Sequence, residues 1–394
     1  MKKNRLKPLL KHPGGKSKEI KYFKEYYPNI KIDRFIESFA GGAAVYFDFD
    51  KKVNKYIIND YDSYISEFYK IIQGYNIDEK NNLDYSRRFN IFFIEYKNII
   101  DIHSSIDTII NECNISSNIN DKKLLINSIL NNIKSHNFYK LFKNKLNNLY
   151  LYFDKYLDKN RLYLINKIDK DNNLNISFDI ILYFKKSFHE AIYYYYRDIY
   201  NKSLKKYNEL NSNINKDNKL IDLSPIDIFA WFYVKEFSFT GMVRYNKNGL
   251  FNVPYAGFSY MNKDISKKYD YFLSNNVKLK LNNTIIDNLD FEYFFRKYNY
   301  FDTNDFLFLD PPYDTKFSNY IANYNFDYEE QKRLKNEVSK LNCKWMMVIK
   351  KTDFIYDLYK EYNIIEFDKK YGINFKNRIS KDTKEVIHLI ITNY

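Results

Sequence analysis

The sequence predicts an α/β fold in which a parallel sheet begins near the N-terminus, is interrupted by helices, and is completed near the C-terminus. Three short segments carry this prediction: "DRFIESFAGGAAVYF", "KYIIND" and "FLFLDPPY", at residues 33–47, 55–60 and 306–313. Each begins with an apolar run and then reaches a glycine, a polar residue or a proline, as buried strands of parallel sheets do.

Residues 1–75 read as strand, helix, strand, and we expect them to form the first part of a catalytic domain. The first strand ends near Glu37, and Gly41 and Gly42 turn the chain into a helix. Glycines at such a turn let a ligand approach the backbone. Asp60 follows at the end of the second strand, where an acid commonly holds ribose hydroxyls. The layout is typical of a nucleoside-cofactor site, and no Lys-Ser/Thr phosphate loop is present. The alternative is a tight turn beside a solvated aspartate.

A second glycine pair lies in "KHPGGKS", residues 11–17. It is interpreted either as a loop over the cofactor, with Lys16 reaching a carboxylate, or as an ordinary surface turn.

Residues 76–276 are expected to form a helical insertion and target-recognition domain. Glycine is absent from much of this region, and large apolar residues recur at helical spacing, for example Leu125, Ile129 and Ile133. "KKSFHEAIYYYYRDIYNKSLKKYNEL" predicts a longer helix, residues 185–210. In "LSPIDIFAWFYVKEF", Ser224 can cap a helix that begins with a proline.

Residues 277–394 are expected to complete the catalytic domain. Four segments are strand candidates, and "YEEQKRLKNEVSKLN" is predicted to be a helix between two of them. The strand candidates are "VKLKLNNTIIDNLDF", "DFLFLD", "CKWMMVIK" and "EVIHLIITNY".

Composition narrows the class of protein only in part. The formal net charge of +14 favours phosphate-rich partners, but a coding bias toward Lys, Asn, Ile and Tyr explains the same basicity.

Cys113 and Cys343 lie far apart, which argues against a disulfide framework and fits a reducing compartment. The N-terminal residues lack the apolar core of a signal peptide, and no apolar run reaches the ~18 residues of a membrane span, so a cytoplasmic location is expected. The five histidines lack ligand spacing, so no metal site is expected.

The stretch "DPPY", residues 310–313, places a carboxylate at the end of a buried strand and fixes the next two residues. Asp310 and the carbonyl of Pro311 can accept hydrogen bonds from an exocyclic amine, and Pro312 helps to hold those acceptors still. Tyr313 can stack on a planar ring. The carboxyl ends of strands are where open α/β sheets bind ligands. The alternative is an edge-strand end followed by a turn.

"DPPY", "FIESFAGGAAVYF" and "HPGGK" together resemble the Dam-like, alpha-group DNA adenine N6-methyltransferases of the D12 class. "TGMVRYNKNGLFNVPYAGF", residues 240–258, resembles the DNA-reading β-hairpin of that family, and "YYYYRDIYN", residues 193–201, resembles the helix before it. The resemblance covers roughly residues 7–75 and 190–394, and the motifs follow the family's order.

The resemblance implies a Rossmann-like sheet that binds S-adenosylmethionine. Lys16, Asp60 and Asp310 match positions that bind this cofactor, and the catalytic motif is Asp310, Pro311, Pro312 and Tyr313. His12 stands where the family often has an aromatic, so its ring is expected to pack on the cofactor. The remaining implied cofactor residues are Phe39, Gly41, Asp290 and Phe291.

The resemblance also implies contacts with double-stranded DNA. Phe239 replaces a common tyrosine and can still wedge into a base step, whereas Thr240 replaces a common asparagine. Arg244 can read guanine bidentately, or contact phosphate instead. The implied DNA-binding residues are Lys11, Phe239, Met242, Arg244, Asn246 and Pro254.

The implied activity is methyl transfer from S-adenosylmethionine to N6 of an adenine flipped out of duplex DNA, with GATC as the site by family analogy. A cognate restriction endonuclease is an implied partner, and action without one is the alternative. Two other hypotheses remain: an amino-methyltransferase acting on cytosine N4 or on RNA, and a catalytically inactive DNA-binding regulator.

Overall fold

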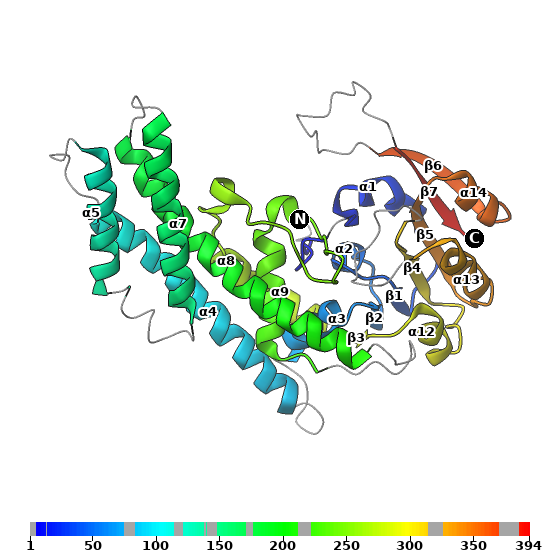
Figure 1. Cartoon of the computed structure of the whole chain (residues 1–394). Coiled ribbons are helices and arrows are strands. Elements are labelled where there is room, and N and C mark those ends of the chain that lie inside the picture. The colour runs from blue at the N-terminus through cyan, green and yellow to red at the C-terminus, as the bar shows by residue number, and fades with distance from the viewer. Residues whose placement is uncertain are drawn as a thin grey trace. The chain divides into compact units, whose positions relative to one another are not determined.

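The computed structural model describes residues 5–12, 14–74, 83–113, 121–137, 139, 148–170, 176–211, 222–313, 326–369 and 386–394. The chain divides into two compact units, which we call the sheet unit and the helical unit (Figure 1). The predicted boundary at residue 75 lies outside the described residues. The sheet unit comprises Met1–Ser86, Tyr207–Asp222 and Phe272–Tyr394, and the helical unit comprises Arg87–Lys206 and Leu223–Tyr271.

A seven-stranded sheet forms the core of the sheet unit, in the order β3-β2-β1-β4-β5-β7-β6, and Figure 1 labels its strands. Strands β1 to β5 are parallel, and β7 is antiparallel to both β5 and β6. This arrangement confirms the predicted α/β fold with a methyltransferase-type sheet. The strands are β1 (Arg34–Glu37), β2 (Lys55–Asn59), β3 (Thr284–Asp287), β4 (Phe306–Leu309), β5 (Lys344–Lys350), β6 (Asn363–Lys369) and β7 (Val386–Thr392).

Helices cover both faces of the sheet because successive side chains of each buried strand point to opposite faces. Phe35 of β1 stacks on Phe49 at 4.1 Å between ring centroids, on the face where Phe23 covers Phe308 at 5.4 Å. Its neighbour Ile36 belongs to the core cluster of the opposite face. The first face is covered by α1 (Ile20–Phe23) and α2 (Ala44–Asp48), and the second by α12 (Phe291–Lys297), α13 (Tyr328–Val338) and α14 (Asp353–Tyr359).

One predicted strand is partly wrong. The residues "VKLKL" belong to helix α11 (Asn275–Asn282), and β3 begins only at Thr284. Val277 and Leu281 are fully buried while Leu279 between them is 68% exposed, so the burial follows the four-residue period of a helix. The remaining elements of the sheet unit are η1 (Lys16–Lys18), η2 (Lys24–Tyr26) and α3 (Ser63–Gln73).

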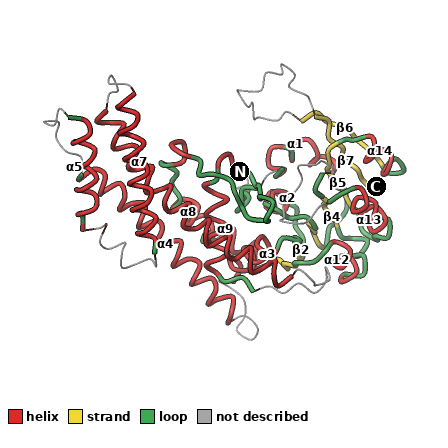
Figure 2. Tube along the Cα trace, viewed as in Figure 1, coloured by secondary structure: helices red, strands yellow, loops and turns green. Residues whose placement is uncertain are grey.

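The described part of the helical unit contains helices and loops (Figure 2). The predicted helix after Ser224 is confirmed as α9, with a capping box between Ser224 and Asp227. The predicted face of Leu125, Ile129 and Ile133 is buried on α5. The helices are α4 (Leu83–Glu112), α5 (Lys122–Ser135), α7 (Leu149–Lys170), α8 (Ile176–Asn211), α9 (Pro225–Phe237), η4 (Phe239–Gly241), η5 (Gly257–Tyr260) and α10 (Ser266–Phe272).

A helix that crosses a membrane must be both long and apolar, and the helices of this chain can be compared with that requirement. Among the described residues, no helix has both the length and the apolar character that a bilayer crossing requires.

Candidate active site

A cavity of about 1050 Å³, counting the space open to solvent at its mouth, lies in the sheet unit at the carboxyl ends of β1, β2 and β4. The strand order reverses between β1 and β4, and this switch point is where open α/β sheets bind ligands. Every residue predicted for catalysis or cofactor binding lines this cavity: His12, Lys16, Phe39, Gly41, Asp60, Asp290, Phe291, Asp310, Pro311, Pro312 and Tyr313.

The turn after β1 is built around the ring of His12. Gly41 has φ of +48°, and a Cβ atom placed there would lie 2.9 Å from Cδ2 of His12. A Cβ on Gly42 would meet the carbonyl oxygen of Leu10 at 3.1 Å. Glycine is therefore required at Gly41 by both its backbone angle and its neighbour.

Asp60 closes the same turn from the end of β2. Its Oδ2 accepts a hydrogen bond from the backbone N–H of Gly41 at 2.7 Å, and its Oδ1 accepts one from Asp62 at 2.8 Å. Asp60 thereby ties the end of β2 to the glycine turn after β1.

Lys16 connects the N-terminal loop to the DPPY turn, residues 310–313. Its Nζ donates to Oδ1 of Asp310 at 2.5 Å, to the hydroxyl oxygen of Tyr313 at 3.1 Å and to the carbonyl of Gly14 at 3.4 Å. The side chain is only 2% exposed. Burial disfavours the charge of Lys16, but Asp310, Tyr313 and Glu19 together outweigh this effect, so the pKa of Lys16 is raised.

Burial raises the pKa of Asp310, and the adjacent Lys16 ammonium opposes that rise. We regard the two groups as an ion pair, because an ammonium that close favours the carboxylate. Among the described residues, none donates a hydrogen bond to Oδ2 of Asp310.

His388 of β7 is a second hydrogen-bond partner of the Tyr313 hydroxyl, in addition to Lys16. Its Nε2 lies 3.2 Å from that hydroxyl, and its Nδ1 lies 3.4 Å from the carbonyl of Val386. Burial lowers the pKa of His388 to about 3, so the ring is neutral at ordinary pH. A neutral ring that donates from Nδ1 accepts at Nε2, so Tyr313 donates to His388 while it accepts from Lys16.

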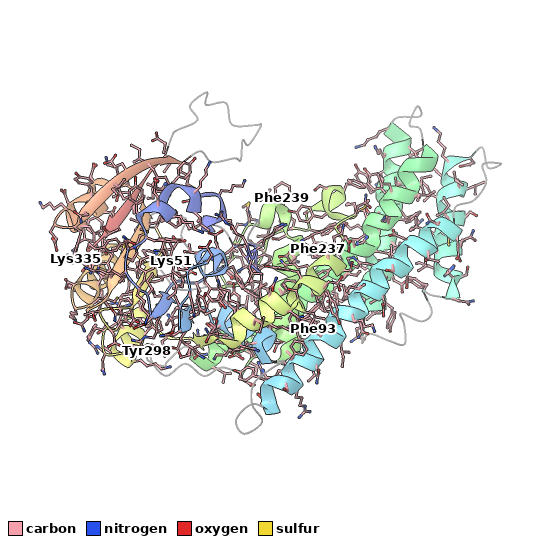
Figure 3. All side chains as sticks on the ribbon, turned by 180° about the vertical axis from the view of Figure 1, so that it is seen from behind. Lys51, Phe93, Phe237, Phe239, Tyr298 and Lys335 are labelled. Carbon is pink, nitrogen blue, oxygen red and sulfur yellow. The ribbon has the colours of Figure 1, made fainter. Side chains whose placement is uncertain are left out.

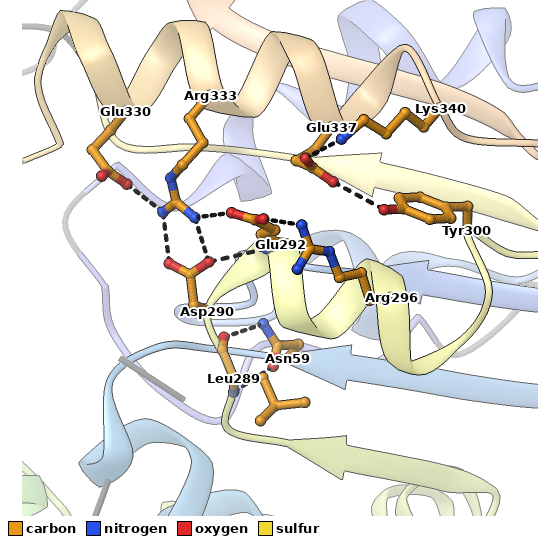
Figure 4. Close-up of polar contacts among 10 residues, drawn as sticks. All are labelled: Asn59, Leu289, Asp290, Glu292, Arg296, Tyr300, Glu330, Arg333, Glu337 and Lys340. Carbon is orange, nitrogen blue, oxygen red and sulfur yellow. Dashed lines mark hydrogen bonds and ion pairs between the residues drawn. The ribbon is translucent and has the colours of Figure 1, made fainter. Parts of the chain in front are cut away.

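Asp290 and Phe291 are expected to contact the adenine of the cofactor, and we call these two residues the adenine wall. Arg333 of α13 holds Asp290 (Figure 4). Both carboxylate oxygens of Asp290 accept hydrogen bonds from Arg333 at 2.7 Å, and Asp290 also caps α12. The guanidinium lies over the Phe291 ring, 4.0 Å from its centroid. The Asp290 carboxylate is thus committed within the protein, which leaves the Phe291 ring and the nearby backbone to face a ligand.

Asn59, at the end of β2, fixes the residue before that wall (Figure 4). Its Oδ1 accepts from the N–H of Leu289 at 2.9 Å, and its Nδ2 donates to the carbonyl of Leu289 at 3.0 Å. Nδ2 also donates to the carbonyl of Ser38 at 3.1 Å, which connects the segment to the end of β1.

Sequence reasoning did not assign Asn59, Arg333 or His388 to the site. His388 could have been noticed as the imidazole within the apolar run "VIHLII", since buried strands rarely carry an unpaired polar group. Arg333 stands in a charged helix, where its pattern is that of a solvated face.

The predicted DNA-binding residues are not among those lining the cavity. Lys11 is an exposed residue of the sheet unit, and the other five belong to the helical unit. Phe237 is 1% exposed at the end of α9, whereas Phe239 is 46% exposed just beyond it (Figure 3). Arg244, Asn246 and Pro254 are also exposed, and Met242 is half-buried.

Residues 238–256 form a closed loop, which we call the reading loop. Two antiparallel bridges, Ser238 with Tyr255 and Tyr245 with Phe251, give the predicted hairpin its pairing. Arg244 donates from Nε to Oδ1 of Asn252 at 2.8 Å. The Oδ1 of Asn246 accepts two backbone hydrogen bonds and so shapes the tip.

One face of α8 supports the reading loop. The amide of Asn201 donates to the carbonyl of Phe251 at 3.1 Å and accepts from its N–H at 2.8 Å, as a neighbouring strand would. Tyr193 donates to the carbonyl of Val253 at 2.8 Å. The buried side of the loop is therefore fixed, while its exposed side carries Phe239 and Arg244.

The residues that line the cavity are chemically suited to a nucleoside cofactor such as S-adenosylmethionine. A glycine turn that no larger residue could replace lies beside an acid placed for ribose hydroxyls, and the Phe39 and Phe291 rings offer apolar walls. No group of three or more His, Cys, Asp or Glu side chains in the described ranges could hold a metal ion.

The chain was compared with known proteins. A family model described as D12 class N6 adenine-specific DNA methyltransferase matches residues 12–373. The chain is 36% identical over 207 residues to Type II methyltransferase M.CviBI of Paramecium bursaria Chlorella virus NC1A, covering 50% of this chain and 76% of that protein. It is 30% identical over 198 residues to Type II methyltransferase M.MjaIII of Methanocaldococcus jannaschii, covering 48% of this chain and 64% of that protein.

Proposed function

The chain belongs to the D12 class of N6 adenine-specific DNA methyltransferases, and on that basis we propose that it transfers a methyl group from S-adenosylmethionine to N6 of an adenine flipped out of duplex DNA. One observation carries the proposal. The Lys16–Asp310–Tyr313 cluster lines the same cavity as the Gly41 turn, so an amine acceptor and a nucleoside site share one space.

The residues that would hold the cofactor surround the glycine turn. Gly41 gives the backbone close approach, Asp60 accepts from ribose hydroxyls, and Phe291 packs against the adenine ring. S-adenosylmethionine supplies an electrophilic methyl group on a sulfonium. His12, which packs against Gly41, forms the adjoining wall, and Lys16 adds positive charge beside the carboxylate end.

The DPPY turn would hold the adenine. Oδ1 of Asp310 is occupied by Lys16, which leaves Oδ2 to accept a hydrogen bond from the exocyclic amine. The Pro311 carbonyl accepts the second amine hydrogen, and Tyr313 stacks under the ring. Two acceptors favour a more tetrahedral nitrogen, whose lone pair can form the N–C bond as the C–S bond breaks. One N6 proton then passes to solvent water, directly or through Oδ2 of Asp310, and catalysis rests on positioning and electrostatics.

The reading loop would provide the sequence specificity. Arg244 reads guanine in the major groove, Phe239 wedges into a base step, and Lys11, Met242, Asn246 and Pro254 add further contacts. GATC is the site we propose to test first. The named relatives are Type II methyltransferases, and by analogy we propose a cytoplasmic enzyme that works beside a cognate restriction endonuclease.

The test is transfer of tritium from methyl-labelled S-adenosylmethionine to duplex DNA, followed by nucleoside analysis. We expect N6-methyladenine from the unaltered chain and a loss of at least a hundredfold in Asp310→Ala, about the cost of a lost catalytic group. Asp302→Ala, which alters an 83% exposed carboxylate, is the matched control. Full activity of Asp310→Ala would refute the catalytic assignment.

The same assay separates the alternatives. N4-methylcytosine as the product, or label that enters RNA in preference to DNA, would replace adenine in DNA as the substrate. Tight DNA binding with no heat of S-adenosylmethionine binding would identify an inactive regulator instead.

A further inference from the structure

Helix α13 contacts the catalytic turn through Gln331. Its Nε2 donates to the carbonyl of Pro312 at 2.9 Å, and the side chain is fully buried. The proline ring fixes φ of Pro312 but leaves ψ to rotate. Because the peptide is planar, ψ sets the direction of the Pro312 carbonyl and of the peptide that leads into Tyr313. Gln331 therefore restrains the backbone angle that sets the direction of the peptide entering Tyr313.

The same helix contacts the adenine wall through Arg333. Figure 4 shows the two hydrogen bonds from Arg333 to Asp290, which fix the start of α12. The guanidinium also covers the Phe291 ring, 4.0 Å from its centroid. Arg333 also pairs with Glu330 of its own helix and lies 3.0 Å from Oε2 of Glu292. Asp290 is 1% exposed, and Arg333 places a positive charge directly beside it.

The spacing of Gln331 and Arg333 explains how one short helix contacts both the DPPY turn and the adenine wall. Positions two apart on an α-helix point in nearly opposite directions, so Gln331 and Arg333 reach different targets. The helix itself is held in place, because Leu334 and Val338 are buried in the sheet's core cluster. Asp327 caps its first turn through the N–H groups of Glu329 and Glu330.

We infer that Gln331 and Arg333 are positioning residues with separable roles, Gln331 for the geometry of methyl transfer and Arg333 for the affinity of the cofactor. The inference rests on the proposed function and names two residues outside the DPPY, glycine-turn and reading-loop motifs. Neither residue lines the cavity. Each acts through a residue that does, Pro312 in one case and Asp290 with Phe291 in the other.

The Gln331→Leu substitution tests the first role. It keeps the volume of the side chain but removes the donor to Pro312. We expect kcat to fall by about ten- to a hundredfold, because a displacement of ~1 Å at the reacting groups has that effect. The dissociation constant of S-adenosylmethionine, measured by calorimetry, should stay within about twofold, since Gln331 does not touch the adenine wall.

Arg333→Met tests the second role, in a background that keeps the protein folded. Removing Arg333 alone would leave the buried Asp290 carboxylate without a partner, so the variant is made together with Asp290→Asn, which retains the helix cap. Relative to Asp290→Asn alone, we expect the double variant to bind S-adenosylmethionine about tenfold more weakly. Its kcat at saturating cofactor should change by no more than about threefold.

Lys332→Ala is the matched control for both. It changes an exposed residue of the same helix whose partner is Glu329, and it should leave kcat and cofactor affinity unaltered. The melting temperature of each variant is measured alongside, because a merely structural role would lower stability without separating kcat from affinity.

The inference would be overturned if Gln331→Leu matched Lys332→Ala, or if it weakened cofactor binding as much as it lowered kcat. Affinity in the Arg333 variant equal to that of Asp290→Asn would overturn the second role. These failures differ from failure of the proposed function, in which the unaltered chain would transfer no methyl group.

Discussion

The ammonium Nζ of Lys16 lies 2.5 Å from Oδ1 of Asp310, although 294 positions separate the two residues in the chain. This ion pair joins the N-terminal glycine loop to the DPPY turn. It holds one oxygen of the carboxylate, and no hydrogen-bond donor among the described residues reaches the other. It also sets the charge state of Asp310, because burial and Lys16 act on its pKa in opposite directions.

We predict that Lys16→Met shifts the acid limb of the pH profile of kcat to higher pH. Burial raises the pKa of Asp310 and Lys16 lowers it, so removing the ammonium raises that pKa further. The protonated carboxyl is a poorer acceptor for the amine, so activity is lost as pH falls through the raised pKa. The measurement is kcat at saturating cofactor and DNA between about pH 4 and 8.

Lys18→Met is the control for that shift, since it removes an exposed cation two residues away. Its profile should superimpose on that of the unaltered chain. An acid limb that stays in place in Lys16→Met would show that Asp310 does not control it.

Gly41→Ala should abolish measurable cofactor binding. The added methyl would meet the His12 ring at 2.9 Å, and φ of +48° costs an alanine about 1 kcal/mol before any clash. Calorimetric titration with S-adenosylmethionine measures the effect.

Gly257→Ala separates backbone strain from collision. Gly257 has φ of +74°, but nothing lies within 4 Å of the position that an added Cβ atom would take. Its unfolding free energy should fall by the strain alone, with cofactor affinity retained. Equal cofactor binding by both variants would contradict the role given to the Gly41 turn.

Arg244→Ala should reduce discrimination at one base pair of the recognition site. A bidentate contact with guanine contributes about 1–3 kcal/mol, so methylation of sites substituted at that pair should rise relative to the cognate site. Asn252→Ala should give a smaller loss in the same direction, because Asn252 orients the guanidinium.

Lys247→Ala tests whether the effect expected of Arg244 could come from any positive charge in the reading loop. It removes an exposed charge near the tip and should weaken binding to all sequences alike. Competition between cognate and substituted duplexes at fixed salt distinguishes the two patterns. A uniform loss in Arg244→Ala would assign that residue to phosphate.

The helical unit should lose stability in acid through Glu236. Burial opposes its charge, but Lys268 and Lys263 outweigh this and lower its pKa from 4.5 to about 2. The unfolded chain therefore binds the extra proton as pH falls below 4.5. A contribution of about 3 kcal/mol, present above that pH, should be lost by pH 2.

Urea unfolding at a series of pH values measures this contribution. Glu236→Gln should flatten the dependence in that window, whereas Glu112→Gln, at a carboxylate that is 60% exposed, should not. An unchanged slope in Glu236→Gln would place the acid sensitivity elsewhere.

Local pattern was enough to locate most of the sheet. Apolar runs ending in turn residues gave β1, β2, β4, β5 and β7. The edge strand β6 has half-exposed residues on both faces, so its sequence lacks such a run. In α11, apolar Val277, Leu279 and Leu281 occupy every second position and so resemble the pattern of a strand. Which of these side chains is buried depends on the face of the helix that packs against the rest of the sheet unit.

The sequence alone predicts those cavity residues whose positions follow from the topology of the sheet. Gly41, Asp60 and Asp310 follow strands whose ends must meet at one edge, so their convergence is a property of the topology. Gln331 and His388 reach the DPPY turn through single long-range contacts, with no local pattern that encodes them. These contacts are determined by the packing of α13 against the sheet and by the pairing of β7 within it.

The central pairing of the sheet has a consequence for how the protein is made. β1 pairs with β4, and the Arg34–Asp305 ion pair beside them joins residues 271 positions apart, with the whole helical unit encoded between them. When β1 and β2 have just left the ribosome, β4 has not yet been synthesised, so the apolar edge of β1 has no neighbouring strand to cover it. The helical unit, whose contacts lie within a mostly continuous span, can fold first. We therefore expect nascent chains to depend on chaperones until β4 emerges.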